Sequence, residues 1–285
     1  MPLNILPFQA LACPLDGAPL QRHGAAWRCA AGHSFDVAGP GYVHLLPVQN
    51  KRSRDPGDSR EMVAARRRFL NAGHYQPIAA AVARAALAEL PATGVVSCLD
   101  AGSGEGYYLR QLAATPGNGR TLALLGLDIS KWAVQAAAKQ DGRPGWVVGS
   151  NANLPVLPGT LDRVLCLFGF PVYGEFARVL KADGQLLQVD AGPDHLRELR
   201  AIIYPRPKPE RTGEAPAPPG FTRLAEESVR YSLHLDGPEP IADLLAMTPH
   251  LYRASAEGRA RAAALTALSL TVDVRLVRLG RDPAR

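Results

Sequence analysis

The residues with the clearest chemical meaning form a glycine-rich run, Leu99-Asp-Ala-Gly-Ser-Gly-Glu-Gly106, directly after an apolar stretch. Glycines at such a position let the backbone turn tightly and approach a ligand closely. A second apolar stretch ends at Asp128, where a carboxylate can accept hydrogen bonds from both hydroxyls of a ribose. Together the two features predict a site for a ligand that contains a nucleoside.

The acidic residues of the run decide between two classes of cofactor. Nicotinamide dinucleotides bind the pattern Gly-x-Gly-x-x-Gly, in which the backbone holds a pyrophosphate at a helix N-terminus. Here the pattern is Asp-x-Gly-x-Gly-x-Gly, and the carboxylates of Asp100 and Glu105 would repel phosphate. S-adenosylmethionine has no phosphate and carries a sulfonium and an ammonium group, so acidic neighbours suit it. The run therefore predicts a methyltransferase whose cofactor contacts include Asp100, Gly102, Gly104, Glu105 and Asp128.

A second cluster has the composition of a small zinc site. One turn supplies two ligands three residues apart and a Cys-x-x-x-His pair supplies two more, which is the spacing of a zinc ribbon. The predicted metal ligands are Cys13, Asp16, Cys29 and His33. Three are ordinary zinc ligands, whereas the carboxylate is harder than the thiolate expected in its place. The alternative is a module without metal, held together by Leu15, Trp27 and Phe35.

Basic residues are concentrated in one short segment. The chain has a net charge of +6 and a pI of about 9.3, and seven of its basic residues lie between positions 51 and 68. Positive charge in a cluster attracts phosphate by releasing counterions, so RNA is the predicted partner. The predicted RNA-binding residues are Lys51, Arg52, Arg54, Arg66 and Arg67. The alternative is a solvated helix face without a ligand.

Length and composition limit the architecture. A chain of 285 residues, 47% of them hydrophobic, can hold one large α/β domain and a smaller unit. No apolar run is long enough to span a bilayer, and the N-terminus lacks the regions of a signal peptide. Four scattered cysteines do not form a secreted disulfide framework. We therefore expect a cytoplasmic protein without a membrane anchor.

Apolar runs and helical stretches alternate through the middle of the chain. Strands are expected at residues 95–100, 121–128, 145–148, 161–168 and 185–190, and helices at 107–114, 131–139, 174–180 and 194–203. This alternation predicts an α/β fold with a doubly wound, Rossmann-like sheet. Ligands bind at the carboxyl ends of such strands, where the glycine run, Asp128 and the stretch 149–153 all fall.

The N-terminal part has a different pattern. Residues 26–28 and 42–46 are expected as short strands of a small ribbon. Asp58 is expected to cap a helix that ends near residue 71, and Glu61 completes a capping pair.

The C-terminal part predicts a loop followed by two strands. Residues 204–221 are crowded with proline and are expected to be a loop. Residues 229–235 and 268–279 alternate between apolar and polar types, as strands that close a sheet do.

With these residues in view, the chain resembles the bacterial 23S rRNA (guanine-N1-)-methyltransferase family. The matching stretches are 41–49, 51–58, 65–75, 104–108, 192–199 and 247–249. The resemblance covers nearly the full length, and the blocks 51–58 and 69–75 are more specific than the glycine run. It implies a zinc-ribbon-like RNA-recognition domain at 1–50, a basic loop and linker helix at 51–75, and a class I methyltransferase domain at 76–285. The implied substrate is a guanine in a hairpin loop of domain II of 23S rRNA.

The resemblance also implies roles for single residues. Tyr75, Gly104, Glu105 and His195 match cofactor contacts of the family, and Cys13, Cys29 and His33 match its zinc ligands. Asp16 departs from the family pattern, which puts the metal in question and leaves the enzyme unaffected.

The implied reaction needs a base. Guanine N1 holds a proton at neutral pH, so its attack on a methyl group requires a carboxylate or imidazole within hydrogen-bond reach. Asp190, at the end of the fifth strand, is the first candidate for this catalytic role, ahead of Asp55 and Asp58 in the basic loop. The target atom lies on the Watson–Crick edge, so the guanine must be unpaired or flipped out, and the side chains that could stack on it are Tyr173, Phe168 and Phe170.

Two other functions remain open. A small-molecule methyltransferase would not need the N-terminal module or the arginine cluster. A noncatalytic RNA-binding protein could keep the fold, although the glycine run and Asp128 are intact. A homodimer would let two copies hold one RNA loop, and no residue pattern requires it.

Overall fold

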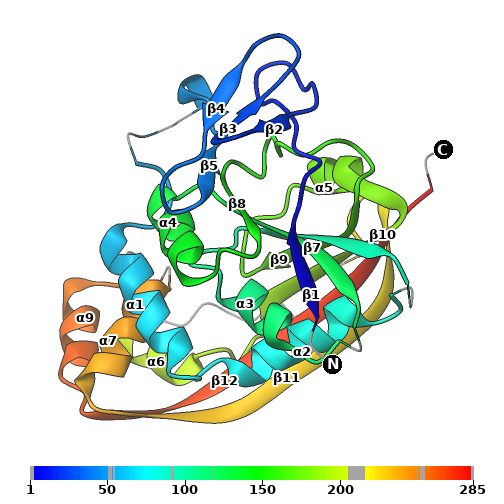
Figure 1. Cartoon of the computed structure of the whole chain (residues 1–285). Helices are drawn as coiled ribbons and strands as arrows, with labels where there is room; N and C mark the ends of the chain where they lie inside the picture. Colours follow the sequence, from blue (N-terminus) through cyan, green and yellow to red (C-terminus); the bar gives the residue numbers. More distant parts are fainter. Residues whose placement is uncertain are drawn as a thin grey trace.

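The computed structural model describes residues 3–50, 53, 55–90, 93–117, 119–204, 216–248, 250 and 254–283. In this part of the chain a nine-stranded mixed sheet runs through the molecule, and a three-stranded sheet stands beside one end of it (Figure 1). Helices cover the faces of the large sheet, so the α/β class predicted from the alternating pattern is confirmed.

Five parallel strands form the centre of the large sheet in the order β8-β7-β6-β9-β10. They span Gly145–Val148 for β8, Thr121–Asp128 for β7, Val95–Ala101 for β6, Leu161–Leu167 for β9 and Leu180–Ala191 for β10. In chain order these are the third, second, first, fourth and fifth strands, which is the order of a doubly wound sheet. The order reverses between β6 and β9, and such a reversal is where these sheets bind ligands.

The central strands are apolar along their whole length because both of their faces are covered. Leu99, Leu125 and Val164, one on each of three neighbouring strands, have no exposed surface. Continuous apolar runs of this kind are typical of parallel sheets. Because of them, most of the strand ends predicted from the sequence lie within one residue of the observed ends. β10 starts at Leu180, earlier than expected, with an irregular register between Leu180 and Gln185.

Two long antiparallel strands complete the C-terminal side. β12 (Ala267–Arg281) pairs with β10, and β11 (Phe221–Asp236) pairs with β12 at the edge. The two predicted closing strands are confirmed, and both are longer than expected. Because Asp190 is in register with Arg275, β12 runs past the carboxyl end of β10 and reaches the ligand-binding edge.

Most helices cover one face of the sheet, and α5 and most of the N-terminal segment cover the other. One apolar cluster contains side chains of α1, α2, α3, α4, α6, α7 and α9, and the other joins Phe176 of α5 to Trp27 and Cys13. The helices are α1 (Arg60–Asn71), α2 (Gln76–Leu87), α3 (Tyr107–Ala114), α4 (Lys131–Gln140), α5 (Tyr173–Val179), α6 (Arg197–Ile203), α7 (Pro238–Met247) and α9 (Ala256–Ala263). No helix in the described ranges has the length and apolarity needed to cross a membrane.

The N-terminal segment contributes to both sheets. β2 (Gln21–His23), β3 (Ala26–Arg28) and β4 (Ser34–Asp36) form the small antiparallel sheet, which contains the strand expected at 26–28. The expectation that 42–46 belongs to the same ribbon is wrong. β5 (Tyr42–His44) pairs in parallel with β8, and Val43 and Leu45 are buried there.

One strand near the N-terminus was not predicted. β1 (Asn4–Pro7) pairs in parallel with the first half of β7, whose second half pairs with β8. A four-residue strand has little pattern of its own, so its partner decides its conformation.

The first helix begins one residue later than expected. Ser59, and not Asp58, is the N-cap of α1, and its hydroxyl accepts a hydrogen bond from the backbone N–H of Met62. The Asp58 carboxylate instead forms an ion pair with Arg66, at 2.8 Å.

Candidate functional site

The glycine run turns from β6 into α3 as predicted. Gly102, Gly104 and Gly106 all have positive φ, at 101°, 55° and 82°, where other residues are strained. The backbone N–H of Gly102 donates to the Leu127 carbonyl at the end of β7, at 2.8 Å. At Gly106 a Cβ would lie 2.5 Å from the Trp146 ring, so close packing as well as conformation requires glycine. The loop therefore lies at the carboxyl edge of the sheet, and the Arg66 side chain covers it at Gly104.

Asp128 stands where β7 ends, beside this loop. Its Oδ2 accepts a hydrogen bond from the Gly104 N–H at 2.9 Å, and its Oδ1 accepts one from the Ser130 N–H at 2.8 Å. Burial raises the pKa of the Asp128 carboxyl. Each carboxylate oxygen has a second lone pair, so both can still accept a hydroxyl of a ribose.

Asp100 is the most unusual group of the site. It is 1% exposed, and neither of its oxygens has a hydrogen-bond partner in the described part of the chain. Burial, followed by the charge of Asp128, raises the pKa of the Asp100 carboxyl to about 8. Buried carboxylates are normally paired, so these two orphaned acceptors indicate a ligand that donates hydrogen bonds or carries positive charge.

Two more buried acceptors lack partners beside Asp100. They are the Ser103 hydroxyl in the glycine run and the side-chain oxygen of Asn151, whose amide nitrogen donates to the Ala101 carbonyl at 3.3 Å. S-adenosylmethionine fits this set, because its ammonium group, ribose hydroxyls and adenine amino group are all donors. The residues present therefore suit the cofactor that the sequence predicts.

Glu105 does not present its carboxylate to the ligand. That carboxylate has no exposed surface and accepts hydrogen bonds from Arg110, at 3.0 Å, and from Gln140, at 2.6 Å. The expectation that Glu105 would repel a phosphate is therefore wrong, because Arg110 neutralises its charge inside the protein. The electrostatic preference for a cationic cofactor rests on Asp100 and Asp128.

Tyr75 and His195 come together from distant parts of the chain, as the resemblance implies for two residues at one cofactor. The Tyr75 hydroxyl lies 3.4 Å from His195 Nε2, and the Phe168 ring stacks on the imidazole. Burial lowers the pKa of His195 to about 4, so the ring is neutral at physiological pH. Its Nδ1 accepts a hydrogen bond from the Asp273 N–H, so the proton is on Nε2 and the Tyr75 oxygen is its acceptor.

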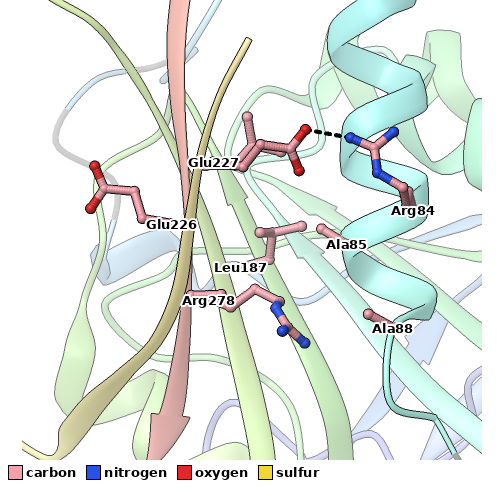
Figure 2. Close-up of a pocket in the computed structure, with 9 residues that line it drawn as sticks. Arg84, Ala85, Ala88, Leu187, Glu226, Glu227 and Arg278 are labelled. Carbon is pink, nitrogen blue, oxygen red and sulfur yellow. Dashed lines mark hydrogen bonds and ion pairs between the residues drawn. The ribbon is translucent and has the colours of Figure 1, made fainter.

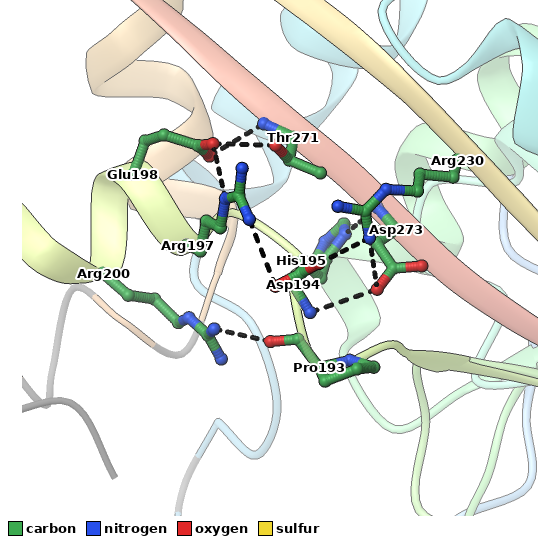
Figure 3. Close-up of polar contacts among 9 residues, drawn as sticks. All are labelled: Pro193, Asp194, His195, Arg197, Glu198, Arg200, Arg230, Thr271 and Asp273. Atoms are coloured by element: carbon green, nitrogen blue, oxygen red, sulfur yellow. Dashed lines mark hydrogen bonds and ion pairs between the residues drawn. The ribbon is translucent and has the colours of Figure 1, made fainter. Parts of the chain in front are cut away.

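A polar cluster on β12 fixes the loop that carries His195 (Figure 3). The carboxylate of Asp273 accepts from the Asp194 N–H at 3.1 Å, and Arg230 forms ion pairs with Asp194 at 2.6 Å and with Asp273 at 3.5 Å. Gly192 packs directly against the Asp273 carboxylate and leaves no space for a side chain. Asp273 was not predicted from the sequence; the available signal was a single acidic residue in an apolar strand.

The predicted RNA-binding residues fall into three groups. Lys51, Arg52 and Arg54 lie outside the described residues. Arg67 is exposed on α1 and has no ion-pair partner in the described ranges. The contacts of Arg66 do not match its predicted role in RNA binding. Its guanidinium points inward, pairs with Asp58 and donates to the Met247 carbonyl at 3.0 Å.

The predicted base lies at the same edge of the sheet. Asp190 is exposed near the end of β10, and its carboxylate accepts from the Gln188 side chain at 2.6 Å. The backbone N–H of Phe168 donates to the Val189 carbonyl, which places the 168–170 loop beside Asp190. Phe170 is 89% exposed, an unusual state for an aromatic ring.

The four predicted metal ligands converge between two turns of the N-terminal segment. The ligand atoms of Cys13, Asp16, Cys29 and His33 all lie within 4.8 Å of one another. His33 Nδ1 is 3.4 Å from the Cys13 sulfur, 3.3 Å from the Cys29 sulfur and 3.1 Å from Asp16 Oδ2. Zinc bonds of about 2.0–2.3 Å in a tetrahedron separate ligand atoms by roughly 3.3–3.8 Å, so the cluster has about the size of a zinc site.

A hollow of 220 Å³ lies elsewhere, between α2 and the strands β10, β11 and β12 (Figure 2). Arg84 and Glu227 form an ion pair across it, and Arg278 pairs with Glu89 at 3.0 Å. The carboxylates that line it, Glu226 and Glu227, have arginine partners, so the described lining lacks the orphaned acceptors of the glycine loop.

The fold and the loop together define a class I, S-adenosylmethionine-dependent methyltransferase. Consistent with this, residues 99–188 match the model of a methyltransferase domain, and residues 11–54 match that of the RlmA N-terminal zinc ribbon.

Full-length relatives extend the comparison. The chain is 36% identical to a protein of Micromonospora griseorubida that bears the name of a 23S rRNA (guanine-N(1)-)-methyltransferase, over 96% of this chain and 98% of the relative. It is 32% identical to the 23S rRNA (guanine(748)-N(1))-methyltransferase of Streptomyces fradiae, over 88% and 89%. The chain belongs to the 23S rRNA (guanine-N(1)-)-methyltransferase family.

Proposed function

We propose that this protein transfers a methyl group from S-adenosylmethionine to N1 of a guanine in 23S rRNA, in a domain II hairpin loop. The observation that carries the transfer chemistry is the set of orphaned acceptors on Asp100, Ser103 and Asn151 beside the glycine loop. The relatives, which are similar over nearly the whole chain, support the substrate.

Each predicted cofactor residue has a proposed task. Bound S-adenosylmethionine supplies a methyl group that is activated by its sulfonium. Asp100 accepts the ammonium group, Asp128 accepts the ribose hydroxyls, and Tyr75, oriented by His195, donates its hydroxyl proton to the ligand. Gly102, Gly104 and Glu105 act through the backbone of the loop. Most of the rate enhancement then comes from holding the two reactants in line, worth about 7–11 kcal/mol when the geometry is good.

Asp190 is the proposed base that removes the N1 proton of guanine. It is exposed at the carboxyl edge of the sheet and neighbours the 168–170 loop, whose Phe170 ring is available to stack on an unpaired base. Asp190→Asn should lower the single-turnover rate by about 10²–10⁴-fold without changing affinity for the cofactor. An unchanged single-turnover rate would eliminate Asp190 as the base.

Zinc is the proposed metal, held by Cys13, Asp16, Cys29 and His33. One oxygen of Asp16 accepts from the Ala18 N–H at 2.9 Å, which leaves the other, Oδ2, directed at the cluster. Asp16→Cys should bind zinc more tightly, because thiolate is the softer ligand, and Asp16→Ala should bind it more weakly. Competition against a chromophoric chelator measures both, and equal affinity in all three proteins would exclude Asp16 as a ligand.

RNA binding is assigned to the N-terminal part. In this proposal, residues 1–50 and the basic segment 51–75, with Lys51, Arg52, Arg54 and Arg67, hold the phosphates while residues 76–285 carry out the transfer. A cytoplasmic location follows from an rRNA substrate. A homodimer stays a prediction, and the mass of the protein in solution by light scattering decides it.

Radiolabel transfer tests the substrate class. Label from S-adenosylmethionine should enter unmodified 23S rRNA and a domain II hairpin fragment, and Asp100→Asn should reduce both. Label in small molecules with none in RNA would favour a small-molecule methyltransferase. RNA binding without any transfer would favour a noncatalytic RNA-binding protein.

A further inference from the structure

Arg66 occupies a position on α1 that a charged side chain rarely takes. It follows the buried Val63 by three residues and precedes the buried Leu70 by four, so it lies within the buried stripe of the helix. Its side chain is 28% exposed, while the neighbouring Arg67 is exposed. The helix therefore directs the Arg66 guanidinium into the protein, toward the glycine loop.

One terminal nitrogen of the Arg66 guanidinium is bonded to protein groups, and the other lies over the glycine loop. Nη2 forms the ion pair with Asp58 at 2.8 Å and donates to the Met247 carbonyl at 3.0 Å. Nη1 lies 3.3 Å from the place where a Cβ on Gly104 would be, and it has no hydrogen-bond partner in the described part of the chain. A guanidinium fixed in this way offers the N–H groups of Nη1 to a ligand on the loop.

Charge complementarity identifies the group that Nη1 meets. The cofactor carries an ammonium and a carboxylate on the same carbon, and the acids Asp100 and Asp128 suit the ammonium and the ribose but would repel the carboxylate. A cation is needed beside them. Arg110 also lies near the loop, but its guanidinium is bound to Glu105 and Asn71. Within the described residues, Arg66 is the arginine over the loop that has donors left for a ligand.

We propose that Arg66 binds the α-carboxylate of the methionine part of S-adenosylmethionine through Nη1. This inference rests on the proposed function, because it assumes that the loop holds this cofactor. Asp58 and Met247 act as positioning groups that keep the guanidinium over Gly104. Arg66 is thereby a cofactor residue rather than an RNA contact.

Ligands that differ in the carboxylate give a direct test. Binding is measured calorimetrically, without RNA, for S-adenosylmethionine, S-adenosylhomocysteine, decarboxylated S-adenosylmethionine and 5′-methylthioadenosine. Arg66→Met should weaken the first two by about 10- to 100-fold, as expected for a lost charge-assisted hydrogen bond, and change the last two by less than about twofold. Arg66→Lys should recover part of the loss. Lys139→Met, which removes an exposed positive charge from α4, should leave the affinity for all four ligands unchanged.

Two results would overturn the proposed role of Arg66, and a third would overturn the cofactor assignment. Equal weakening of all four ligands by Arg66→Met would reduce Arg66 to a structural contact, and no weakening would exclude any contact; either result overturns the proposal. Thermal unfolding of the variant separates a folding defect from a binding defect, and the ratio of affinities between ligands is independent of the folded fraction. If the wild-type protein bound none of the four ligands, the cofactor assignment itself would fail. This result is distinguishable from equal weakening and from no weakening by Arg66→Met.

Discussion

Three acidic side chains near the glycine loop behave differently because their partners differ. Glu105 is neutralised by Arg110, Asp128 is bound by two backbone N–H groups, and Asp100 has no hydrogen-bond partner in the described ranges. A buried carboxyl without donors holds its proton until a cation or donor arrives. Asp100 is therefore the residue whose ionisation is most closely coupled to cofactor binding.

This coupling predicts that cofactor binding releases a proton. The pKa of Asp100 is raised to about 8 in the free protein, so the group is protonated at pH 7, and the ligand ammonium must displace that proton. Affinity should therefore increase as pH rises from 6 to 7.5. Calorimetry in buffers of different ionisation enthalpy should give release of about one proton near pH 7 for the wild type and none for Asp100→Asn. The same release from both proteins would contradict the assignment.

At the scale of elements, β12 holds the loop that brings His195 to Tyr75. The backbone N–H groups of Gly192 and Leu196 donate to the carbonyls of Asp273 and Thr271. The His195 ring accepts a hydrogen bond from the Asp273 N–H, and the Asp273 carboxylate accepts one from the Asp194 N–H. A strand outside the parallel core thus positions part of the cofactor site.

Removing this support should weaken cofactor binding without removing a cofactor contact. Asp273→Ala leaves the Asp194 N–H without its acceptor and removes the longer of the two ion pairs of Arg230, so we expect KM for S-adenosylmethionine to rise severalfold while kcat at saturation changes little. Asp273→Asn keeps an acceptor and should lie nearer the wild type. Steady-state kinetics measure both variants. A fall in kcat with unchanged KM would show that the loop acts in the chemical step instead.

The same elements show which features a sequence reveals. The central strands and the glycine loop were predictable, because strands buried on both faces are continuously apolar and the turn requires glycine. β1 was not predicted, and β5 was expected as a strand but in the wrong sheet, since both are short and pairing with β7 and β8 decides their place. α7 and α9 were missed between two long strands, where α7 begins at Pro238. Arg66 was predicted to bind RNA because its charge was interpreted as a sign of surface exposure, although the helical period places this residue among buried ones.

At the scale of the whole molecule, the metal cluster and the cofactor loop are connected. Backbone hydrogen bonds join Ala12 to Pro155 and Leu157 to Ala10, at 3.0 Å each, so the N-terminal module packs on the segment that follows Asn151. The proposed RNA-recognition module is thereby fixed beside the cofactor edge. In the proposed function, RNA held by this module is thereby presented to the cofactor edge.

Salt dependence tests the electrostatic part of this arrangement. The logarithm of the affinity for a hairpin RNA should fall linearly with the logarithm of the salt concentration, and Arg67→Met should reduce the slope by about 0.7–0.9 if Arg67 contacts one phosphate. Lys139→Met removes the same charge from α4 and should leave the slope unchanged. Filter binding at several salt concentrations measures the slopes. Identical slopes for wild type and Arg67→Met would place Arg67 outside the RNA interface.

The identity of the methylated nucleoside tests the central claim most directly. Unmodified 23S rRNA is incubated with the protein and S-adenosylmethionine, digested to nucleosides and analysed by chromatography with mass spectrometry. We expect 1-methylguanosine, with a reverse-transcription stop in the domain II hairpin because N1 methylation blocks the Watson–Crick edge. A guanosine methylated at another atom, or no methylated nucleoside in the presence of bound cofactor, would contradict this account.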